Sequence, residues 1–187
     1  MVEIKGSVIL DTIKTVKLKY GEEIFKKIIN LLDEEAKQIF EKKTILVTDW
    51  YPIETFMKFV ETLNNLISGG DKEHIIALSE EILFQQLQGI YKIFIKPDSP
   101  EAIIKRVSAI HNIYFRGIGI EATLIGTGKA RVKHIGFEKK HSLISLGIIS
   151  FYKKALAMAG AKNIEIKYIT PFEADKGFTE LEITWSK

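Results

Sequence analysis

The spacing of apolar residues changes near the middle of the chain. Up to about residue 97, apolar positions recur every three or four residues, which is typical of helices that bury one face. This spacing predicts helices over about 10–20, 22–32, 33–40, 52–68 and 71–95. Between the third and fourth of these, Thr44 to Val47 is predicted to be extended and Asp49 to Pro52 to form a turn.

The second half alternates between helical and extended patterns. Ser99 is predicted to cap a helix that starts at Pro100 and ends near Phe115. Beyond Gly117 the apolar period becomes two, and two such runs flank Gly126-Thr127-Gly128, which predicts a β-hairpin. A helix rich in small residues over 142–159 and a second strand pair, 163–170 with 178–185, complete the order helix, hairpin, helix, hairpin.

These elements predict an α+β fold. An N-terminal helical part, residues 1–98, is expected to pack on a C-terminal part, residues 99–187, which holds a four-stranded antiparallel sheet and two helices. Because no long linker separates the parts, we expect one compact unit that shares a core.

Composition excludes several classes of function. The chain has no cysteine, so thiolate metal sites, iron–sulfur clusters and cysteine nucleophiles are excluded. No apolar run approaches the roughly 20 residues of a membrane helix, and the first residues do not resemble a secretory signal, so a cytoplasmic location is expected. Residues 98–187 carry 14 Lys/Arg against 9 Asp/Glu. This surplus is smaller than nucleic-acid binders usually show.

No catalytic constellation can be assembled from the sequence. Gly126-Thr127-Gly128-Lys129 lies between two strands, whereas a phosphate-binding loop opens a helix. No acidic cluster has metal-ligand spacing, and no two histidines show the i, i+4 spacing of a helical zinc site. We therefore expect a protein that is not an enzyme and binds no metal.

Two histidines are candidates for buried roles. His111 lies mid-helix beside the apolar stripe. Two interpretations remain for it: a boundary residue with a half-packed ring, or a ligand to a metal or haem iron. His134 alternates with apolar residues of its strand and is expected to point inward. His141, before a helix, is expected in a loop, and His74 in solvent. The densest basic patch is expected to be a solvated sheet face, with an anion site as the alternative; it comprises Lys129, Arg131, Lys133, Lys139 and Lys140.

A family resemblance covers nearly the whole chain. It is carried by Ile4-Lys5-Gly6, by Tyr20-Gly21, by Trp50-Tyr51-Pro52 ahead of a helix, and by the final order of helices and hairpins. The chain resembles an uncharacterised family of about two hundred residues best known from myxobacteria. That family is similar to the 4-vinyl reductase type small-molecule-binding domain and to the haem nitric-oxide/oxygen-binding domain, which has a helical part followed by an α/β part.

The resemblance carries few functional residues into this chain. The haem domain implies a proximal histidine on the helix before the first C-terminal strand, and His111 is the residue that fits. It also implies a Tyr-x-Ser-x-Arg motif for the haem propionates, but the matching stretch, residues 135–140, lacks all three residues and offers only Lys139 and Lys140 as charge. The cysteines implied by the 4-vinyl reductase type are absent.

The function predicted from the sequence is a sensory or regulatory module that needs no cofactor. It is expected to hold an apolar small molecule, with an acidic group as an option, in a concave space between the helical part and the sheet. The predicted ligand-binding residues are Phe84, Leu87, Tyr91, Val107, His111, Tyr114, Phe115, Lys133, Lys139 and Lys140. One alternative is a haem gas sensor with His111 as axial ligand. Another is a scaffold that binds a protein partner or a second copy of itself through exposed Trp50, Tyr51 and Phe56.

Overall fold

The second half of the chain folds in the predicted order. The computed structural model describes residues 1–42, 44–88, 95–174 and 176–186. Its second half contains α6 (Pro100–Tyr114), β3 (Phe115–Arg116), β4 (Gly119–Gly126), β5 (Lys129–Ile135), α7 (Ser142–Met158), β6 (Lys162–Thr170) and β7 (Phe178–Ser186). The predicted α+β class, with two helices and two hairpins in this half, is confirmed.

The four long strands form one antiparallel sheet in the order β4-β5-β7-β6. Alternation along the strands gives the sheet two different faces. Val132 of β5 faces Leu181 of β7, and both side chains are buried. The opposite face is polar: Glu182 pairs there with Lys129 at 2.9 Å and with Arg131 at 3.6 Å. The sheet therefore needs cover on one face only.

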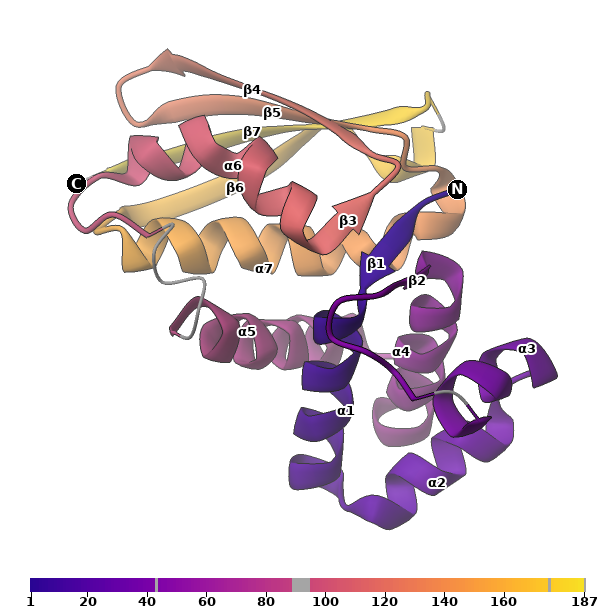
Figure 1. The fold of residues 1–187 in the computed structure, drawn as a ribbon. Coiled ribbons are helices and arrows are strands. Elements are labelled where there is room, and N and C mark those ends of the chain that lie inside the picture. The colour runs from indigo at the N-terminus through magenta and orange to yellow at the C-terminus, as the bar shows by residue number, and fades with distance from the viewer. Residues whose placement is uncertain (43, 89–94, 175, 187) are drawn as a thin grey trace.

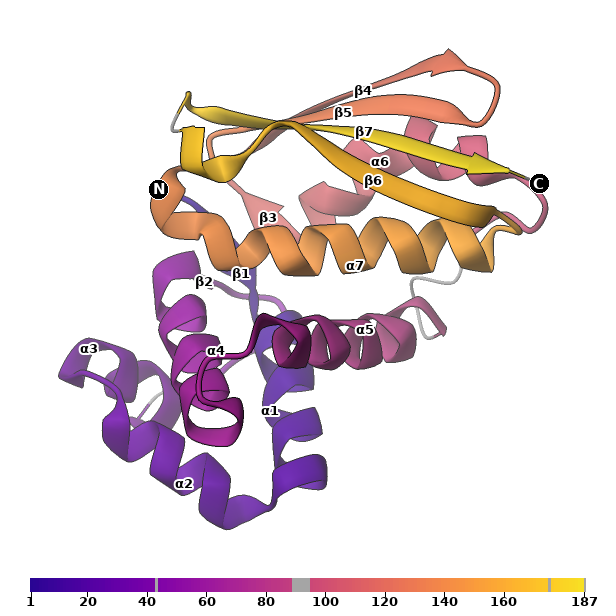
Figure 2. The same ribbon diagram turned by 180° about the vertical axis from the view of Figure 1, so that it is seen from behind.

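Helices α6 and α7 supply that cover. Both lie along the same face of the sheet, and the helices of the first half lie beyond α7, away from the sheet (Figures 1 and 2). The molecule is thus layered as sheet, then α6 and α7, then the N-terminal helices, among which α5 lies alongside α7 (Figure 2).

The first half is helical, as predicted. It contains α1 (Gly6–Tyr20), α2 (Glu22–Leu31), α3 (Glu34–Lys37), α4 (Ile53–Ser68) and α5 (Lys72–Gln88), with a π-helical turn at Gln38–Lys42. Gly21 ends α1 with a φ of 85°, a conformation that glycine adopts without strain. The Asp33 carboxylate accepts a hydrogen bond from the backbone N–H of Ala36 at 2.9 Å, so the predicted cap of α3 is confirmed.

Several local predictions differ from the structure. Trp50–Pro52 is a strand, β2, and not a turn, whereas the segment predicted to be extended, 44–47, belongs to no strand. Ser99 occupies the position before α6, but its side chain makes no capping hydrogen bond. The predicted helix end near Ile95 is not among these differences: α5 is described from Lys72 to Gln88, and the segment 89–94 that leads to Ile95 lies outside the described residues.

A small second sheet joins the two halves. Its order is β2-β1-β3, with β1 (Glu3–Lys5) in the centre. Ile4 pairs with Tyr51 on one side and with Phe115 on the other, and it is 1% exposed. Because β1 and β2 are distant in sequence, no local sequence pattern indicates that they pair.

Two apolar clusters make up the core of the described residues. The larger contains buried residues of both halves, including Ile4, Phe56, Ile104, Tyr152 and Ile183. The smaller lies among the N-terminal helices around Phe59 and Leu63. The halves therefore pack through a common apolar interior. None of the described helices is long and apolar enough to span a membrane.

Replacing Gly6 by alanine tests the junction of β1 and α1. A Cβ atom at Gly6 would overlap the carbonyl oxygen of Leu46 and touch the Tyr51 ring. We expect Gly6→Ala to lower the free energy of unfolding by about 1–3 kcal/mol in urea titrations, the usual range for overpacking. Ser7→Ala is the matched control, because the buried Ser7 hydroxyl has no partner among the described residues. Equal stability of the two variants would contradict the tight packing.

Candidate functional site

A cavity of about 120 Å³ lies between the N-terminal helices and the layer formed by α6 and α7. Its walls come from α1, α4, α5, α6 and α7, with β1 and β3 at one side. The lining residues are Ile4, Val8, Thr12, Phe56, Met57, Val60, Ile75, Leu78, Ser79, Ile82, Leu83, Gln86, His111, Tyr114, Phe115, Leu143, Ile144, Gly147, Ile148 and Phe151. They are mostly apolar, as expected of a small-molecule site.

The cavity lies one layer away from where the sequence placed it. The apolar space was expected against the sheet, but no residue of β4, β5, β6 or β7 lines it. The reason is that α6 and α7 already bury the inner side chains of the sheet, such as Val132 and Leu181. The N-terminal helices consequently meet helices, and the gap forms between helices.

His111 is the most unusual side chain of the lining. It is 3% exposed, and both of its ring nitrogens are buried with no hydrogen-bond partner among the described residues. The interpretation as a half-packed boundary residue is therefore wrong. Its imidazole ring lies 5.8 Å from the ring of Phe115 and 5.4 Å from that of Phe151, which meets it edge-on. Unpaired buried polar groups are rare in native proteins.

His134 lies behind His111 on the sheet side. The two imidazole rings are 5.2 Å apart, and His134 Nε2 is 3.1 Å from the hydroxyl of Tyr152 on α7. Its predicted inward orientation is confirmed, since it is fully buried. Burial lowers the pKa of His134 to about 4. Burial, followed by the neighbouring His134, holds the pKa of His111 well below its ordinary value. Both imidazoles are therefore neutral at pH 7.

The structure brings together three of the predicted ligand-binding residues. His111, Tyr114 and Phe115 all line the cavity. Leu87 and Val107 are completely buried but belong to the core and not to the lining.

Of the two further aromatic residues predicted to bind the ligand, Phe84 is described and Tyr91 is not. Phe84 is 40% exposed, outside the lining, and carries the ammonium of Lys154 over its ring at 4.4 Å. Tyr91 lies outside the described residues.

The three predicted lysines lie away from the lining. Lys133 is on the outer face of the sheet, where its ammonium sits 4.2 Å from the Phe178 ring. Lys139 and Lys140 are exposed in a 3₁₀ turn, Lys139–His141, that precedes α7. The cavity thus has no cation from this set to pair with an acidic ligand.

Most of the lining was missed by the sequence-based prediction, because it comes from α1, α4, α5 and α7. Gly147 is an example: a Cβ atom there would have only the Ser79 hydroxyl nearby, at 3.9 Å. The sequence shows that α7 is rich in small residues, but the spacing of these residues alone does not tell which neighbouring helix they face.

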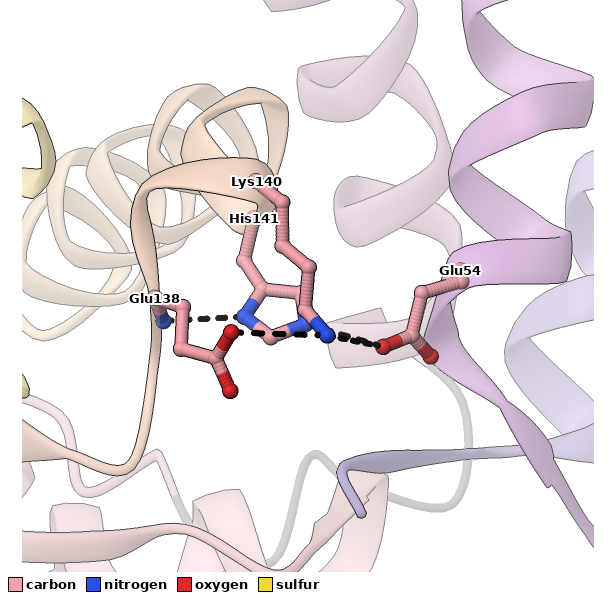
Figure 3. A network of polar contacts seen from close by, with 4 residues as sticks. All are labelled: Glu54, Glu138, Lys140 and His141. Atoms are coloured by element: carbon pink, nitrogen blue, oxygen red, sulfur yellow. Dashed lines mark hydrogen bonds and ion pairs between the residues drawn. The ribbon is translucent and has the colours of Figure 1, made fainter.

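A polar network ties α4 to the turn before α7 (Figure 3). The Glu54 carboxylate is 3.1 Å from Lys140 Nζ and 3.3 Å from His141 Nε2. The backbone N–H of Glu138 donates to His141 Nδ1 at 2.9 Å, which places the ring proton on Nε2, facing Glu54. His141 was expected to be a loop residue, but its side chain is only 1% exposed and is held by these contacts.

The Glu54 carboxylate stays charged in this network. Burial opposes its ionisation, but hydrogen bonds from its own backbone, Lys140 and His141 outweigh burial and lower its pKa. Because Phe56 and Leu143, two residues further along each element, line the cavity, the network anchors two of the cavity walls to each other.

The remaining histidine also differs from expectation. His74, predicted in solvent, is half-buried and lies 2.6 Å from the Tyr20 hydroxyl and 2.9 Å from Asn64 Oδ1. Within the described parts of the chain, no group of three or more His, Asp or Glu side chains is arranged to hold a metal ion.

Comparison with solved structures identifies the fold. An H-NOX protein from S. oneidensis in its Fe(II)NO ligation state superposes with a TM-score of 0.75 at 11% identity, covering 98% of this chain and 99% of the other. The Fe(II) unliganded H-NOX protein from K. algicida gives 0.71 at 11% identity, covering 98% and 97%. This chain has the H-NOX fold.

The sequence comparisons found no match. No family model matches the chain, and no curated protein matches it. The resemblance to the haem nitric-oxide/oxygen-binding domain is therefore confirmed at the level of fold, whereas the resemblance to the myxobacterial family and to the 4-vinyl reductase type has no support. At 9–12% identity, the fold neighbours do not transfer a ligand to this chain.

The residues around the cavity fit a haem only in part. His111 offers unpaired ring nitrogens, which suits an axial ligand of iron. No lysine or arginine is among the lining residues to hold the two propionates. In the stretch that would carry the propionate motif, Phe137 is buried against Phe115 and Phe172, and Lys140 is engaged by Glu54. The lining therefore offers a candidate axial ligand for a haem but no cation for its propionates.

The two buried imidazoles make a specific pH dependence testable. Between pH 6.5 and about 4 the unfolded chain binds a proton at His134 that the folded chain does not, and the same direction holds for His111. Their contribution is complete above pH 6.5 and is lost as the pH falls toward 4. Each adds a slope of up to about 1.4 kcal/mol per pH unit.

We expect His111→Phe to remove one of these two slopes. Urea titrations at pH 7.0, 6.0 and 5.0 would show the free energy of unfolding of the variant falling less steeply than that of the parent protein, by about one proton. Measurements at pH 8.0 and 8.5, well above the ordinary imidazole pKa of about 6.5, are the internal control. Parallel curves for the two proteins would mean that His111 titrates normally in the fold.

Proposed function

We propose that this protein is a non-enzymatic sensory or regulatory module that binds an apolar small molecule in the cavity between the N-terminal helices and α6/α7. The observation that carries the proposal is a cavity with mostly apolar walls whose lining includes His111, an imidazole with both nitrogens buried and without a hydrogen-bond partner among the described residues. An apolar pocket with few polar groups is the usual form of a small-molecule site.

The position of the cavity supports a regulatory role. Its walls are shared by both halves of the chain, from Phe56 and Leu78 on one side to His111 and Ile148 on the other. A molecule bound there contacts both halves at once, so its binding free energy depends on how they pack. H-NOX proteins of the same fold are described in Fe(II) and Fe(II)NO ligation states, and this supports the proposal of a ligand-dependent role.

A haem gas sensor is the second candidate, and His111 favours it. The unpaired nitrogens of His111 and the shared fold support an axial ligand at this position. Two observations favour the first candidate over a haem sensor. The lining has no cation for the propionates, and a haem needs far more space than the cavity volume of about 120 Å³.

The structure gives little support to the scaffold alternative, because the aromatic residues expected to bind a partner are mostly buried. Tyr51 and Phe56 are 8% and 9% exposed, and the half-exposed Trp50 ring is stacked by cations, with Lys5 Nζ at 4.4 Å and the Arg116 guanidinium at 4.2 Å. Two of the three aromatic side chains are thus unavailable to a partner.

Gly147 offers a way to test the first candidate. A leucine at this position grows from α7 into the cavity without meeting backbone, so Gly147→Leu is expected to fill the space and keep the fold. Native mass spectrometry of protein purified from its own host is expected to show a stoichiometric small molecule on the parent protein and none on Gly147→Leu. Gly147→Ala, which leaves most of the volume, is the matched control and should retain the molecule. A clean apo mass for all three proteins would contradict the proposal.

Absorption spectroscopy separates the haem candidate from the first. After mixing with hemin, we expect no stoichiometric Soret band, because the lining supplies no cation for the propionates. A stoichiometric band that disappears in His111→Ala would reverse the order of the two candidates.

A further inference from the structure

The volume of the cavity limits the size of a guest, if the proposed function holds. At about 120 Å³ it is slightly smaller than the engineered apolar cavity of about 150 Å³ that binds benzene. A guest that fits without rearrangement has about six to eight non-hydrogen atoms, by comparison with benzene. This is the size of one small ring with a single substituent.

The lining also limits the charge of a guest. It contains no Lys, Arg, Asp or Glu side chain. Among its polar side chains, the Thr12 hydroxyl donates to the Val8 carbonyl at 2.8 Å and the Gln86 amide donates to Asp11 at 2.8 Å. A charged group in the cavity would lose its hydration without gaining a counter-charge, which disfavours both anions and cations.

The lining has three further polar side chains, Ser79, His111 and Tyr114, and of these His111 combines a donor and an acceptor in one rigid ring. A neutral imidazole has one N–H donor and one nitrogen acceptor, and in this structure both are buried and unpaired. The ring is held by packing against Phe115 and Phe151, which also line the cavity. Its orientation is thus fixed before any guest arrives.

We propose that the cavity selects an uncharged organic molecule of about six to eight non-hydrogen atoms whose one polar group, a hydroxyl or an amide, hydrogen bonds to the imidazole of His111. The apolar body of such a molecule lies against Met57, Ile148 and their neighbours. Its polar group restores a hydrogen bond that the folded protein lacks, so the site discriminates against a guest of equal shape without that group.

A thermodynamic cycle with isosteric probes tests this selection. The probes are cyclohexanol and methylcyclohexane, which differ by a hydroxyl in place of a methyl group, with cyclohexylamine and cyclopentanecarboxylate as charged analogues. Dissociation constants are measured by calorimetry for the parent protein and for His111→Phe, which keeps a ring at this position. The quantity compared is the ratio of the methylcyclohexane constant to the cyclohexanol constant.

We expect this ratio to fall about tenfold from the parent protein to His111→Phe, which corresponds to about 1.4 kcal/mol of coupling. Comparing ratios cancels the stronger intrinsic partitioning of methylcyclohexane out of water. His74→Phe, the same substitution at a histidine outside the cavity lining, is the matched control and should leave the ratio unchanged. The two charged analogues should bind at least tenfold more weakly than cyclohexanol.

A second measurement covers the case in which His111→Phe does not fold. In the parent protein, cyclohexanol should shift the ¹⁵N resonances of the His111 imidazole, and methylcyclohexane should not. An unchanged ratio, equal ¹⁵N shifts for both probes, or preferential binding of a charged analogue would overturn this inference while leaving an apolar-ligand site in place. If none of the probes binds the parent protein, or if Gly147→Leu binds them equally well, both this inference and the proposed function fail.

Discussion

Helix α7 has to bury two opposite sides, and this constraint determines where the cavity forms. One side packs on the sheet, where the Tyr152 hydroxyl meets His134 of β5 at 3.1 Å. The other side faces the N-terminal helices with Gly147, Ile148 and Phe151. A helix with two apolar sides needs cover on both. The sheet covers one side of α7, whereas α1, α4 and α5 leave the cavity beside Gly147 on the other.

The unpaired imidazole of His111 follows from the same layering. Its helix, α6, lies between the sheet and the N-terminal layer, and no group of the described residues pairs with the ring nitrogens. Leaving a buried polar group unpaired destabilises a fold by about 1–3 kcal/mol. A phenylalanine would satisfy the packing without that loss, which is why the proposed function gives His111 a role in binding and not in stability.

Much of the fold was predictable because its patterns are local. The change of apolar period beyond Gly117 located both hairpins and α7, and Asp33 capped α3 as expected. The small sheet was not predictable, since Ile4 pairs with Tyr51 and Phe115 only after the chain has folded. The same limit applies to the site: the sequence placed His111 on the correct helix, but its complete burial depends on Phe151 and on His134, which come from other elements.

The network around Glu54 gives the two halves a polar connection next to the apolar cavity. Glu54 lies in the first turn of α4 and His141 directly precedes α7, so the contacts to Glu54 hold the two helices together at one end (Figure 3). The side chains with which α4 and α7 line the cavity are apolar, and apolar packing adapts to a guest more readily than a hydrogen-bonded network does. In the proposed function, a guest therefore lies between walls that are joined by polar contacts at the Glu54 end and by apolar packing elsewhere.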